Sequence, residues 1–588
     1  MIKLSDYVFQ FLEEKGIKQA FLLPGGGAMH LDDSIGKSNI AYTCFLHEQA
    51  AAIAAEAYGQ HTNTPGLVLV TSGPGATNAI TGVTAGWIDS TPMIVLSGQS
   101  KRADLVGDKG VRQIGSQEVQ IVPMIKPITK YAVQVLEPSE IKYHLEKAYY
   151  EATTGRPGPV WLDIPLDVQA CMLDEKTLIG YNVEKETEVC IGETINKTLE
   201  LLRTSEKPLL LAGNGIKLAD AAKELYGLME KLQIPTETTW KTIDLLGEDN
   251  PLYAGHPGIM GDRGANLIVQ NADFILSIGC RLDTSITAFN DRHFGKCAKK
   301  VIVDIDANEI ARMDMDKEAI AVCDAKVFLS ALLEAVGKDS KVISQQTAST
   351  SKLEWLAYCH EIREKNPIVS AAHKNVDDYV SAYYFIGELC KLLREDDVIV
   401  PESSGGAGEI TYQAFKLKMG QKMKNAAGLG SMGFGLPYAI GSCIANDRRR
   451  TILINGDGAF QLNIQELETL HRLELPVKIF IWNNGGYASI RSMQRNNFEG
   501  RYVASDPKSG LTMPNISEVA AAYGFKTYRI KTNAELDEML PIIMKDDEPM
   551  LCEVMVLPEE TVSPRVKAIV GPNGQMTSGP LEKMWPYE

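Results

Sequence analysis

The sequence has no excess of basic residues, because 59 Lys and Arg stand against 75 Asp and Glu, for a formal net charge of -16. Such a surface would repel nucleic acid and anionic membranes, so we expect neither as a partner. The sequence also lacks any run near the roughly 20 apolar residues that a membrane-spanning helix needs. Its start, MIKLSDYVFQFLEEKG, contains acidic residues, so we expect no signal peptide.

Closely spaced cysteines are also absent. The ten cysteines are scattered from Cys44 to Cys552, without the pairs of a zinc site or the density of a secreted disulfide scaffold. Reduced thiols are the simplest account, and we expect a cytoplasmic protein. With 45% hydrophobic and 23% charged residues, the composition is typical of a globular protein, and 588 residues are too many for one core.

Short apolar strands alternate with helix-like stretches, which predicts an α/β fold of three doubly wound parallel-sheet domains. We place them at residues 1–175, 190–340 and 365–560, with a predicted charged linker at 174–187 and a Pro- and Gly-rich tail or lid at 561–588. In the first and third domains, strands such as PGLVLVTSG and RRTILINGDG end in Gly-rich turns. These two domains could face each other across a ligand.

Two turns in the third domain follow apolar strands. TILIN leads into Gly456-Asp457-Gly458-Ala459, and VKIFIW leads into NNGGY, which contains Asn484, Gly486 and Tyr487. A hard cation such as Mg²⁺ prefers oxygen ligands, which the Asp carboxylate and the Asn amide supply. Open α/β sheets bind ligands at the carboxyl ends of their strands, and glycines let backbone amides approach phosphate. Either motif alone would be read as an ordinary turn, but the pair favours a metal-diphosphate site.

At this spacing the two motifs resemble those of the thiamine-diphosphate enzymes. The resemblance implies that Asp457, Asn484 and the carbonyl of Gly486 bind Mg²⁺, which anchors thiamine diphosphate. It also implies cofactor contacts from the rest of the two turns: Gly456, Gly458, Ala459 and Tyr487.

The stretch GLGSMGFGLP, residues 428–437, resembles the acetolactate-synthase branch of that family. In that branch the Met, here Met432, holds the cofactor in a bent conformation, and Gly430 is a further predicted contact. Without the resemblance, the stretch could also be a flexible Gly-rich loop that leads into a helix. Ser404 and Gly405 form another predicted diphosphate loop, although the pattern SSGG is weak by itself.

In the first domain, LHEQAAAIAAEAYG places Glu48 in or near the first turn of a predicted helix. A carboxylate there usually complements only the helix dipole. However, PGGG, HEQAAA and TSGPGATN follow one another as in the pyrimidine-binding domain of acetolactate synthase. The resemblance implies that Glu48 is catalytic and activates the cofactor ring, with cofactor contacts from Pro24, Gly26 and Thr71. It also implies a homodimer or homotetramer with active sites at the subunit interface.

Two departures from acetolactate synthase bear on specificity. That enzyme has Phe-Gln-Glu where this chain has Ser116-Gln117-Glu118, so Ser116 replaces a ring that lines the acceptor pocket, while the predicted catalytic Gln117 is kept. Gln113, with Arg112, could bind a polar acceptor or could lie in a surface loop. Arg281 remains from the RFDDR stretch beside the flavin of acetolactate synthase, but Gly213-Asn214-Gly215 is too short to prove dinucleotide binding, so FAD stays open.

Segments such as FLLPGGGAMHLDDSIG resemble a subgroup of acetolactate-synthase-like proteins associated with surface-polysaccharide loci. Our hypothesis is a carboligase that decarboxylates pyruvate or a similar 2-oxo acid. It would transfer the acyl anion to a carbonyl acceptor such as a nucleotide-linked keto-sugar. The alternatives are an acetolactate synthase that joins two pyruvates, a flavin-linked pyruvate oxidase, a simple 2-oxo acid decarboxylase and a non-catalytic nucleotide-binding module.

Overall fold

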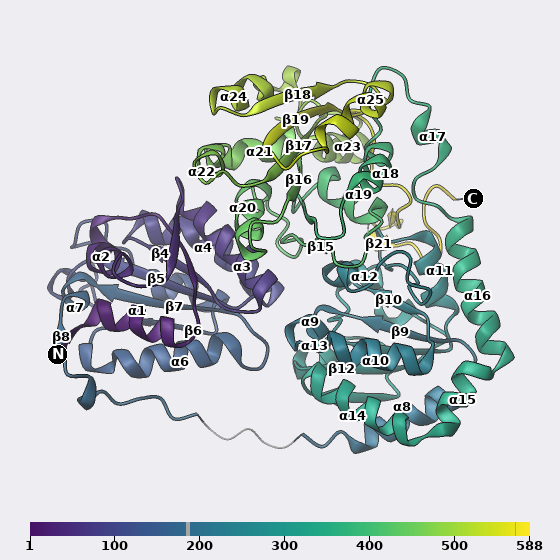
Figure 1. Ribbon diagram of the computed structural model, residues 1–588, viewed down its shortest axis with the longest axis horizontal. Helices are drawn as coiled ribbons and strands as arrows, with labels where there is room; N and C mark the ends of the chain where they lie inside the picture. Colours follow the sequence, from purple (N-terminus) through teal and green to yellow (C-terminus); the bar gives the residue numbers. More distant parts are fainter. Residues whose placement is uncertain (184–188, 571, 575, 588) are drawn as a thin grey trace.

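Three parallel sheets covered by helices make up the chain (Figure 1). The computed structural model describes residues 1–183, 189–570, 572–574 and 576–587. This architecture confirms the predicted α/β fold class. Residues 184–188 of the predicted linker and residues 571, 575 and 588 of the predicted tail lie outside the described residues. Of the helices in the described part of the chain, none is both long and apolar enough to cross a membrane.

The first domain has a six-stranded parallel sheet in the order β3-β2-β4-β5-β7-β6. The central strands are buried along their whole length, as expected for a sheet covered on both faces. The short strand β1 (Ile2–Lys3) pairs with β8 (Met172–Leu173) and ties the two ends of the domain together. The strands are β2 (Gln19–Leu22), β3 (Ala41–Cys44), β4 (Gly66–Val70), β5 (Met93–Gln99), β6 (Tyr131–Gln134) and β7 (Pro159–Pro165). The helices are α1 (Leu4–Glu14), α2 (Met29–Ile35), α3 (Glu48–Thr62), α4 (Pro74–Asp89), α5 (Ile121–Ile125), α6 (Ile141–Thr153) and α7 (Leu166–Gln169).

The third domain repeats the strand order of the first. Its sheet runs β15-β14-β16-β17-β19-β18, so in both domains the second strand along the chain lies at one edge and the fifth at the other. The strands are β14 (Val398–Pro401), β15 (Lys422–Met423), β16 (Thr451–Gly456), β17 (Val477–Asn483), β18 (Lys526–Ile530) and β19 (Met550–Met555). The helices are α17 (Ala371–Lys374), α18 (Ala382–Leu392), α19 (Gly406–Ala414), α20 (Gly435–Ala445), α21 (Asp457–Phe460), α22 (Glu466–Arg472), α23 (Ala488–Asn497), α24 (Ile516–Ala522) and α25 (Asn533–Ile543).

The middle domain has a five-stranded parallel sheet in the order β10-β9-β11-β12-β13. The order reverses between β9 and β11, where doubly wound sheets open a crevice. The strands are β9 (Pro208–Ala212), β10 (Thr236–Thr238), β11 (Phe274–Ile278), β12 (Lys299–Asp304) and β13 (Ala319–Val322). The helices are α8 (Gly192–Thr204), α9 (Asn214–Leu218), α10 (Ala222–Leu232), α11 (Arg263–Asn271), α12 (Thr284–Thr287), α13 (Ala307–Arg312), α14 (Ala325–Lys338), α15 (Ser340–Ala348) and α16 (Thr350–Lys365).

Helix α3 joins the first and third domains. It is rich in alanine and packs between α4 of its own domain and α20 of the third. Two glycines allow this approach: a Cβ on Gly82 would lie 2.6 Å from the Cβ of Ala52, and a Cβ on Gly441 would lie 2.3 Å from the carbonyl oxygen of Ala54. One hydrophobic cluster therefore runs through both domains.

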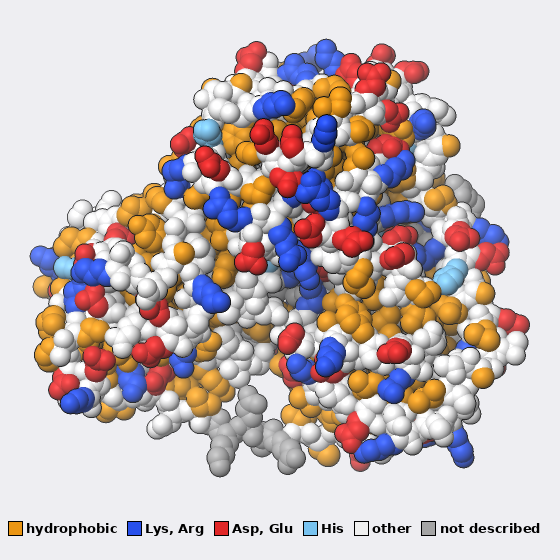
Figure 2. Space-filling model, viewed as in Figure 1, with side chains coloured by type: hydrophobic (Ala, Val, Ile, Leu, Met, Phe, Trp, Pro, Cys, Tyr) orange, Lys and Arg blue, Asp and Glu red, His pale blue; other side chains and the backbone are white. Residues whose placement is uncertain are grey.

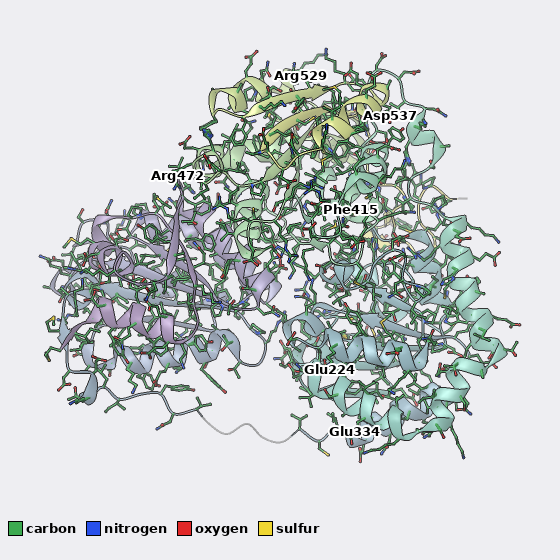
Figure 3. The ribbon with its side chains drawn as sticks, viewed as in Figure 1. Glu224, Glu334, Phe415, Arg472, Arg529 and Asp537 are labelled. Atoms are coloured by element: carbon green, nitrogen blue, oxygen red, sulfur yellow. The ribbon has the colours of Figure 1, made fainter. Side chains whose placement is uncertain are left out.

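Polar contacts also hold the domains together. Lys241 of the middle domain donates to Asp89 (2.6 Å) and Gln60 (3.2 Å) of the first domain and to the carbonyl of Asn425 in the third. Arg472, labelled in Figure 3 where the third domain meets the first, donates to the carbonyl of Cys44 at 2.7 Å. Figure 2 shows Lys and Arg side chains along the centre of one face, where the third domain meets the other two.

Residues 581–584 of the tail are docked on the middle domain, whereas Val562 at its start packs in the core of the third domain. Leu581 and Met584 are buried in the cluster that contains Phe294 and Ile268. The carboxylate of Glu582 accepts from Gln270 at 2.7 Å and pairs with Lys296 at 3.0 Å. The predicted lid function remains a prediction, because these contacts describe a docked position only.

Gly441→Ala tests the α3–α20 contact. The added methyl group would meet the backbone of Ala54, so we expect the free energy of unfolding to fall by about 1–3 kcal/mol. Gly337→Ala is the matched control, since Gly337 lies in α14 with no atom within 4 Å of an added Cβ, and it should stabilise by about 0.5–1 kcal/mol. Urea midpoints of the two variants measure the difference. Equal midpoints would show that α3 and α20 do not pack this closely at Gly441.

Candidate functional site

The predicted metal ligands Asp457, Asn484 and Gly486 lie in two turns, called the metal turns below, at the carboxyl ends of two neighbouring strands. Strands β16 and β17 pair in parallel, with Gly456 opposite Trp482, so the turns that follow them lie side by side. The Asp457 carboxylate accepts a hydrogen bond from the backbone N–H of Gly486 at 2.7 Å and one from that of Gly458 at 2.9 Å. The two predicted turns are therefore joined through Asp457.

The donor set fits a divalent cation. The side-chain oxygen Oδ1 of Asn484 is buried and has no hydrogen-bond partner, which is costly unless another ligand satisfies it. Asp457 is almost fully buried, and this burial raises its pKa to about 7 despite the two backbone hydrogen bonds. A bound cation would satisfy both groups. Within the described ranges no cluster of three or more His, Cys, Asp or Glu could hold a metal, so this site would combine one carboxylate with neutral oxygens.

Glycine is required at two positions of these turns. A Cβ on Gly458 would lie 2.6 Å from the ring of Tyr487, so the ring packs directly against the backbone that follows Asp457. Gly486 has a φ of 115°, in the left-handed region, and a Cβ there would lie 2.8 Å from the side chain of Leu511. Close packing therefore explains the second glycine of GDG, and packing together with backbone conformation explains the second glycine of NNGG.

A buried carboxylate that sequence reasoning missed connects the other predicted cofactor loops. Glu402 follows β14, is fully buried, and accepts from the backbone N–H of Ser403 (2.8 Å) and of Gly435 (3.0 Å). Burial is the largest cause that raises its pKa, to about 7. Glu402 thus links the Ser404–Gly405 loop to the start of α20. The only signal in the sequence was a charged residue at the end of an apolar strand.

The predicted loop around Met432 lies just before α20. Gly430 has a φ of 64°, and the Met432 side chain is 38% exposed. An exposed thioether is free to contact a ligand or a second chain. Its predicted role in bending the cofactor remains a prediction.

Glu48 is the first residue of α3 and is buried. Its Oε2 accepts a hydrogen bond from the side-chain amide of Asn78 in α4 at 3.0 Å. Asn78 belongs to the TSGPGATN motif but was not a predicted site residue. Its amide fixes the orientation of the carboxylate. A Cβ on Gly75 would lie 3.5 Å from the other carboxylate oxygen, so α4 approaches Glu48 closely.

The PGGG turn lies against the end of β4. The backbone N–H of Gly27 donates to Oγ1 of Thr71 at 3.0 Å, and a Cβ on Gly25 would clash with Thr71 at 2.5 Å. Pro24 and Gly26, the predicted contacts, belong to the same turn, and Gly26 has open space where a Cβ would be. The turn, Thr71 and Glu48 thus all lie beyond the carboxyl ends of strands in the first sheet.

The loop with Ser116 and Gln117 contacts the turn that follows β4. A Cβ on Gly73 would lie 2.3 Å from the carbonyl oxygen of Gln117, which itself has a φ of 60°. Both predicted side chains are exposed. Gln113 donates to the carbonyl of Glu118 at 3.0 Å, so its side-chain nitrogen is engaged in holding the loop.

Glu118, which sequence reasoning did not single out, organises this loop. Its buried carboxylate accepts from the backbone N–H groups of Val106, Ile114 and Gly115. Three such bonds fix the conformation that presents Ser116 and Gln117.

Glu48 and Asp457 make their polar contacts in different domains. Gln49, next to Glu48, accepts from Asn463 of the third domain at 3.2 Å. The backbone N–H of Leu46 donates to Glu466 at 3.2 Å. The start of α3 therefore touches the third domain at η8 (Gln461–Asn463) and α22.

A cavity of about 940 Å³ lies between the middle domain and the other two. Its wall includes the switch point between β9 and β11, where a Cβ on Gly213 would lie 2.2 Å from the carbonyl oxygen of Gly279. Arg281 lines it and donates to the carbonyl of Ile88 (3.1 Å) and to Asp283 (2.7 Å). Asp304, at the end of β12, lines it as well. The position and size suit a dinucleotide.

Three family models match successive parts of the chain. They are described as the thiamine pyrophosphate enzyme N-terminal TPP binding domain (residues 2–123), central domain (195–332) and C-terminal TPP binding domain (404–554). Thiamine pyrophosphate is thiamine diphosphate under another name. The metal turns lie in the C-terminal match and Glu48 lies in the N-terminal match.

Curated relatives are similar over nearly the whole chain. The probable acetolactate synthase large subunit of Methanocaldococcus jannaschii is 33% identical, covering 98% of this chain and 95% of that protein. The acetolactate synthase large subunit of Lactococcus lactis is 32% identical (96% and 94%), and isozyme 1 of Escherichia coli is 30% identical (96% and 95%). These matches, with the geometry of the metal turns, place the chain in the thiamine-diphosphate-dependent enzyme family, as an acetolactate-synthase-like member.

Proposed function

We propose that this enzyme decarboxylates pyruvate or a similar 2-oxo acid and transfers the resulting acyl group to a carbonyl acceptor. The observation that carries the proposal is the unpartnered, buried Asn484 oxygen beside the buried Asp457 carboxylate, at adjoining strand ends. These two groups, with the carbonyl of Gly486, would hold Mg²⁺ and through it the diphosphate.

The chain's own residues would prepare the reaction. When bound, thiamine diphosphate supplies a nucleophilic carbon and an electron-accepting ring for decarboxylation. Glu48, oriented by Asn78, would hold a proton against a ring nitrogen of the cofactor. The buried positions of Glu48 and Asp457 limit access of water to the reacting groups. Gln117 would contact the substrate from its loop beside Gly73.

For the acceptor, we favour a second 2-oxo acid, as in acetolactate synthesis. Each relative named above carries the name acetolactate synthase, and the similarity extends over nearly the whole chain. This choice replaces the nucleotide-linked keto-sugar as the first candidate. The keto-sugar remains a second candidate because Ser116 is small, polar and exposed where acetolactate synthase has a bulky ring.

Product analysis separates the two acceptors. Purified enzyme with Mg²⁺ and thiamine diphosphate should convert pyruvate alone into acetolactate, as measured by mass spectrometry. Ser116→Phe should reduce use of bulky acceptors by about 10-fold or more while sparing pyruvate, because a ring fills the pocket. Release of carbon dioxide without any joined product would argue for a simple decarboxylase instead.

We propose further that the active site forms between two copies of the chain, in a homodimer or a pair of dimers, in the cytoplasm. Large apolar side chains are exposed in the loop before α20, at α23 and in the segment that follows it: Met432, Met493, Phe498 and Val503. Exposed apolar groups beside a site favour burial against a partner. All ten cysteines are free, which agrees with a reducing compartment.

Mixing two inactive variants tests both Glu48 and the shared site. Glu48→Gln and Asp457→Ala should each lower kcat by about 10²–10⁴-fold, the first without loss of cofactor binding. If each site combines Glu48 of one chain with Asp457 of the other, then mixed dimers contain one intact site, and activity returns after subunit exchange. No recovery despite proven mixed dimers would place both residues of a site in one chain.

We propose that the cavity beside Arg281 holds FAD. Arg281 and the close approach of Gly213 to Gly279 support a dinucleotide there. The protein purified under native conditions should release FAD on denaturation, measured by absorbance and chromatography. Gly215→Val should reduce the amount of FAD released. Gly215 lines the cavity, and a Cβ at this position would lie 2.8 Å from the Cα of Gly279, so a larger side chain would disturb the cavity wall. Release of a different nucleotide would show that the cavity binds that nucleotide instead of FAD. If the protein binds no FAD even after reconstitution, the proposal is wrong.

A further inference from the structure

Arg491 is a buried cation beneath the metal turn. It lies in α23 and is 7% exposed. Its guanidinium donates to three backbone carbonyls: Asn484 at 2.6 Å, Gly485 at 3.1 Å and Ser505 at 3.1 Å. Two of these carbonyls belong to the turn that carries Asn484 and Gly486, so the guanidinium is hydrogen-bonded to the backbone of that turn.

The partners of Arg491 are unusual for a buried guanidinium. Such a charge is normally compensated by a carboxylate, since burying it unpaired is costly. Among the hydrogen bonds and ion pairs of the described residues, none joins Arg491 to a carboxylate. The carbonyl dipoles compensate it directly, and the Asp457 carboxylate is hydrogen-bonded to the Gly486 amide of the same turn. Arg491 thus adds a fixed positive charge behind the turn without displacing Asp457 from its backbone partners.

The same helix holds a second segment, residues 498–505. The Gln494 side chain donates to the carbonyl of Val503 at 3.1 Å and accepts from the hydroxyl of Ser505 at 2.6 Å. One nitrogen of Arg491 binds both Gly485 and Ser505. The metal turn and this segment are therefore tied to one guanidinium. Phe498 and Val503 expose their apolar side chains from the segment.

We propose that Arg491 is a positioning residue. By holding the backbone carbonyls of Asn484 and Gly485, it orients the side-chain oxygen of Asn484 and the carbonyl of Gly486 for Mg²⁺. It also couples occupation of the metal site to the order of residues 498–505. The proposal rests on the metal site of the proposed function. Its physical basis is the planar fork of the guanidinium, which can bind carbonyls of two loops at once, whereas an ammonium is a point donor. Groups that orient metal ligands in this way typically contribute about 10–100-fold in metal affinity.

Magnesium titration of the full-length protein tests the first half of the proposal. In the presence of thiamine diphosphate, Arg491→Met should weaken Mg²⁺ binding by about 10–100-fold in calorimetry, and Arg491→Lys should recover part of the loss. Arg495→Met is the matched control, because Arg495 is on the same helix, is partly exposed and pairs with Glu559; it should bind Mg²⁺ normally. Unchanged affinity in a folded Arg491→Met protein would overturn the proposal.

Hydrogen exchange tests the coupling. Adding Mg²⁺ and thiamine diphosphate should slow amide exchange in residues 498–505 of the wild type and of Arg495→Met. In Arg491→Met at saturating Mg²⁺ this protection should be lost. If it persists there, the coupling is wrong.

Asp457→Ala separates the two levels of inference. If that variant still binds Mg²⁺ and cofactor normally, then the metal site itself is wrong. If it loses binding while Arg491→Met keeps it, only the role of Arg491 fails. Thermal unfolding of each variant identifies protein that has merely lost its fold, and Arg491→Lys then provides the test in a folded background.

Discussion

The close packing of α3 between α4 and α20 is the contact on which the rest of the molecule depends. Glycine and alanine at the crossing bring backbones together that larger side chains would separate. Glu48 begins this helix, and α20 follows the predicted cofactor loop with Met432. The same contact therefore fixes the position of the first domain relative to the third. Apolar packing stabilises this interface, and the directional hydrogen bonds of Lys241 and Arg472 help to fix the orientation of the domains.

Buried carboxylates that accept hydrogen bonds recur throughout the site. Asp457, Glu402 and Glu118 each accept backbone N–H groups from a turn beyond their own peptide, and Glu48 accepts from a side-chain amide. In each case a charge that would be costly to bury is compensated by fixed dipoles. This arrangement gives loops a defined conformation before any ligand arrives, which reduces the reorganisation that binding and catalysis require.

The three domains divide the chemistry between them. The first presents Glu48 and the loop with Ser116, the third presents the turns predicted to bind the metal, and the middle domain forms most of the wall of a separate cavity. Family membership accounts for the cofactor but not for the acceptor, which is a proposal. Ser116 is the residue proposed to affect the choice of acceptor, and its loop is held by Glu118 and not by contacts of Ser116's own side chain.

The sequence by itself determined the fold class and the family, and it led to Glu48, Asp457 and Asn484 as predicted site residues, because these depend on local patterns: apolar strands, glycine turns and their spacing. It did not identify Asn78, Glu402, Glu118 or Arg491 as site residues. Each of these acts on a backbone or side chain that another part of the chain brings near, as Arg491 does with Ser505 and Glu402 with Gly435. Hydrogen-bond partners of this kind leave no periodic signal. The side-chain nitrogen of Gln113 donates to its own loop, a contact that the sequence did not indicate, and its predicted role toward a substrate stays a prediction. Only the tertiary structure decided these points, because burial and hydrogen-bond geometry exist only once the strands have been brought together.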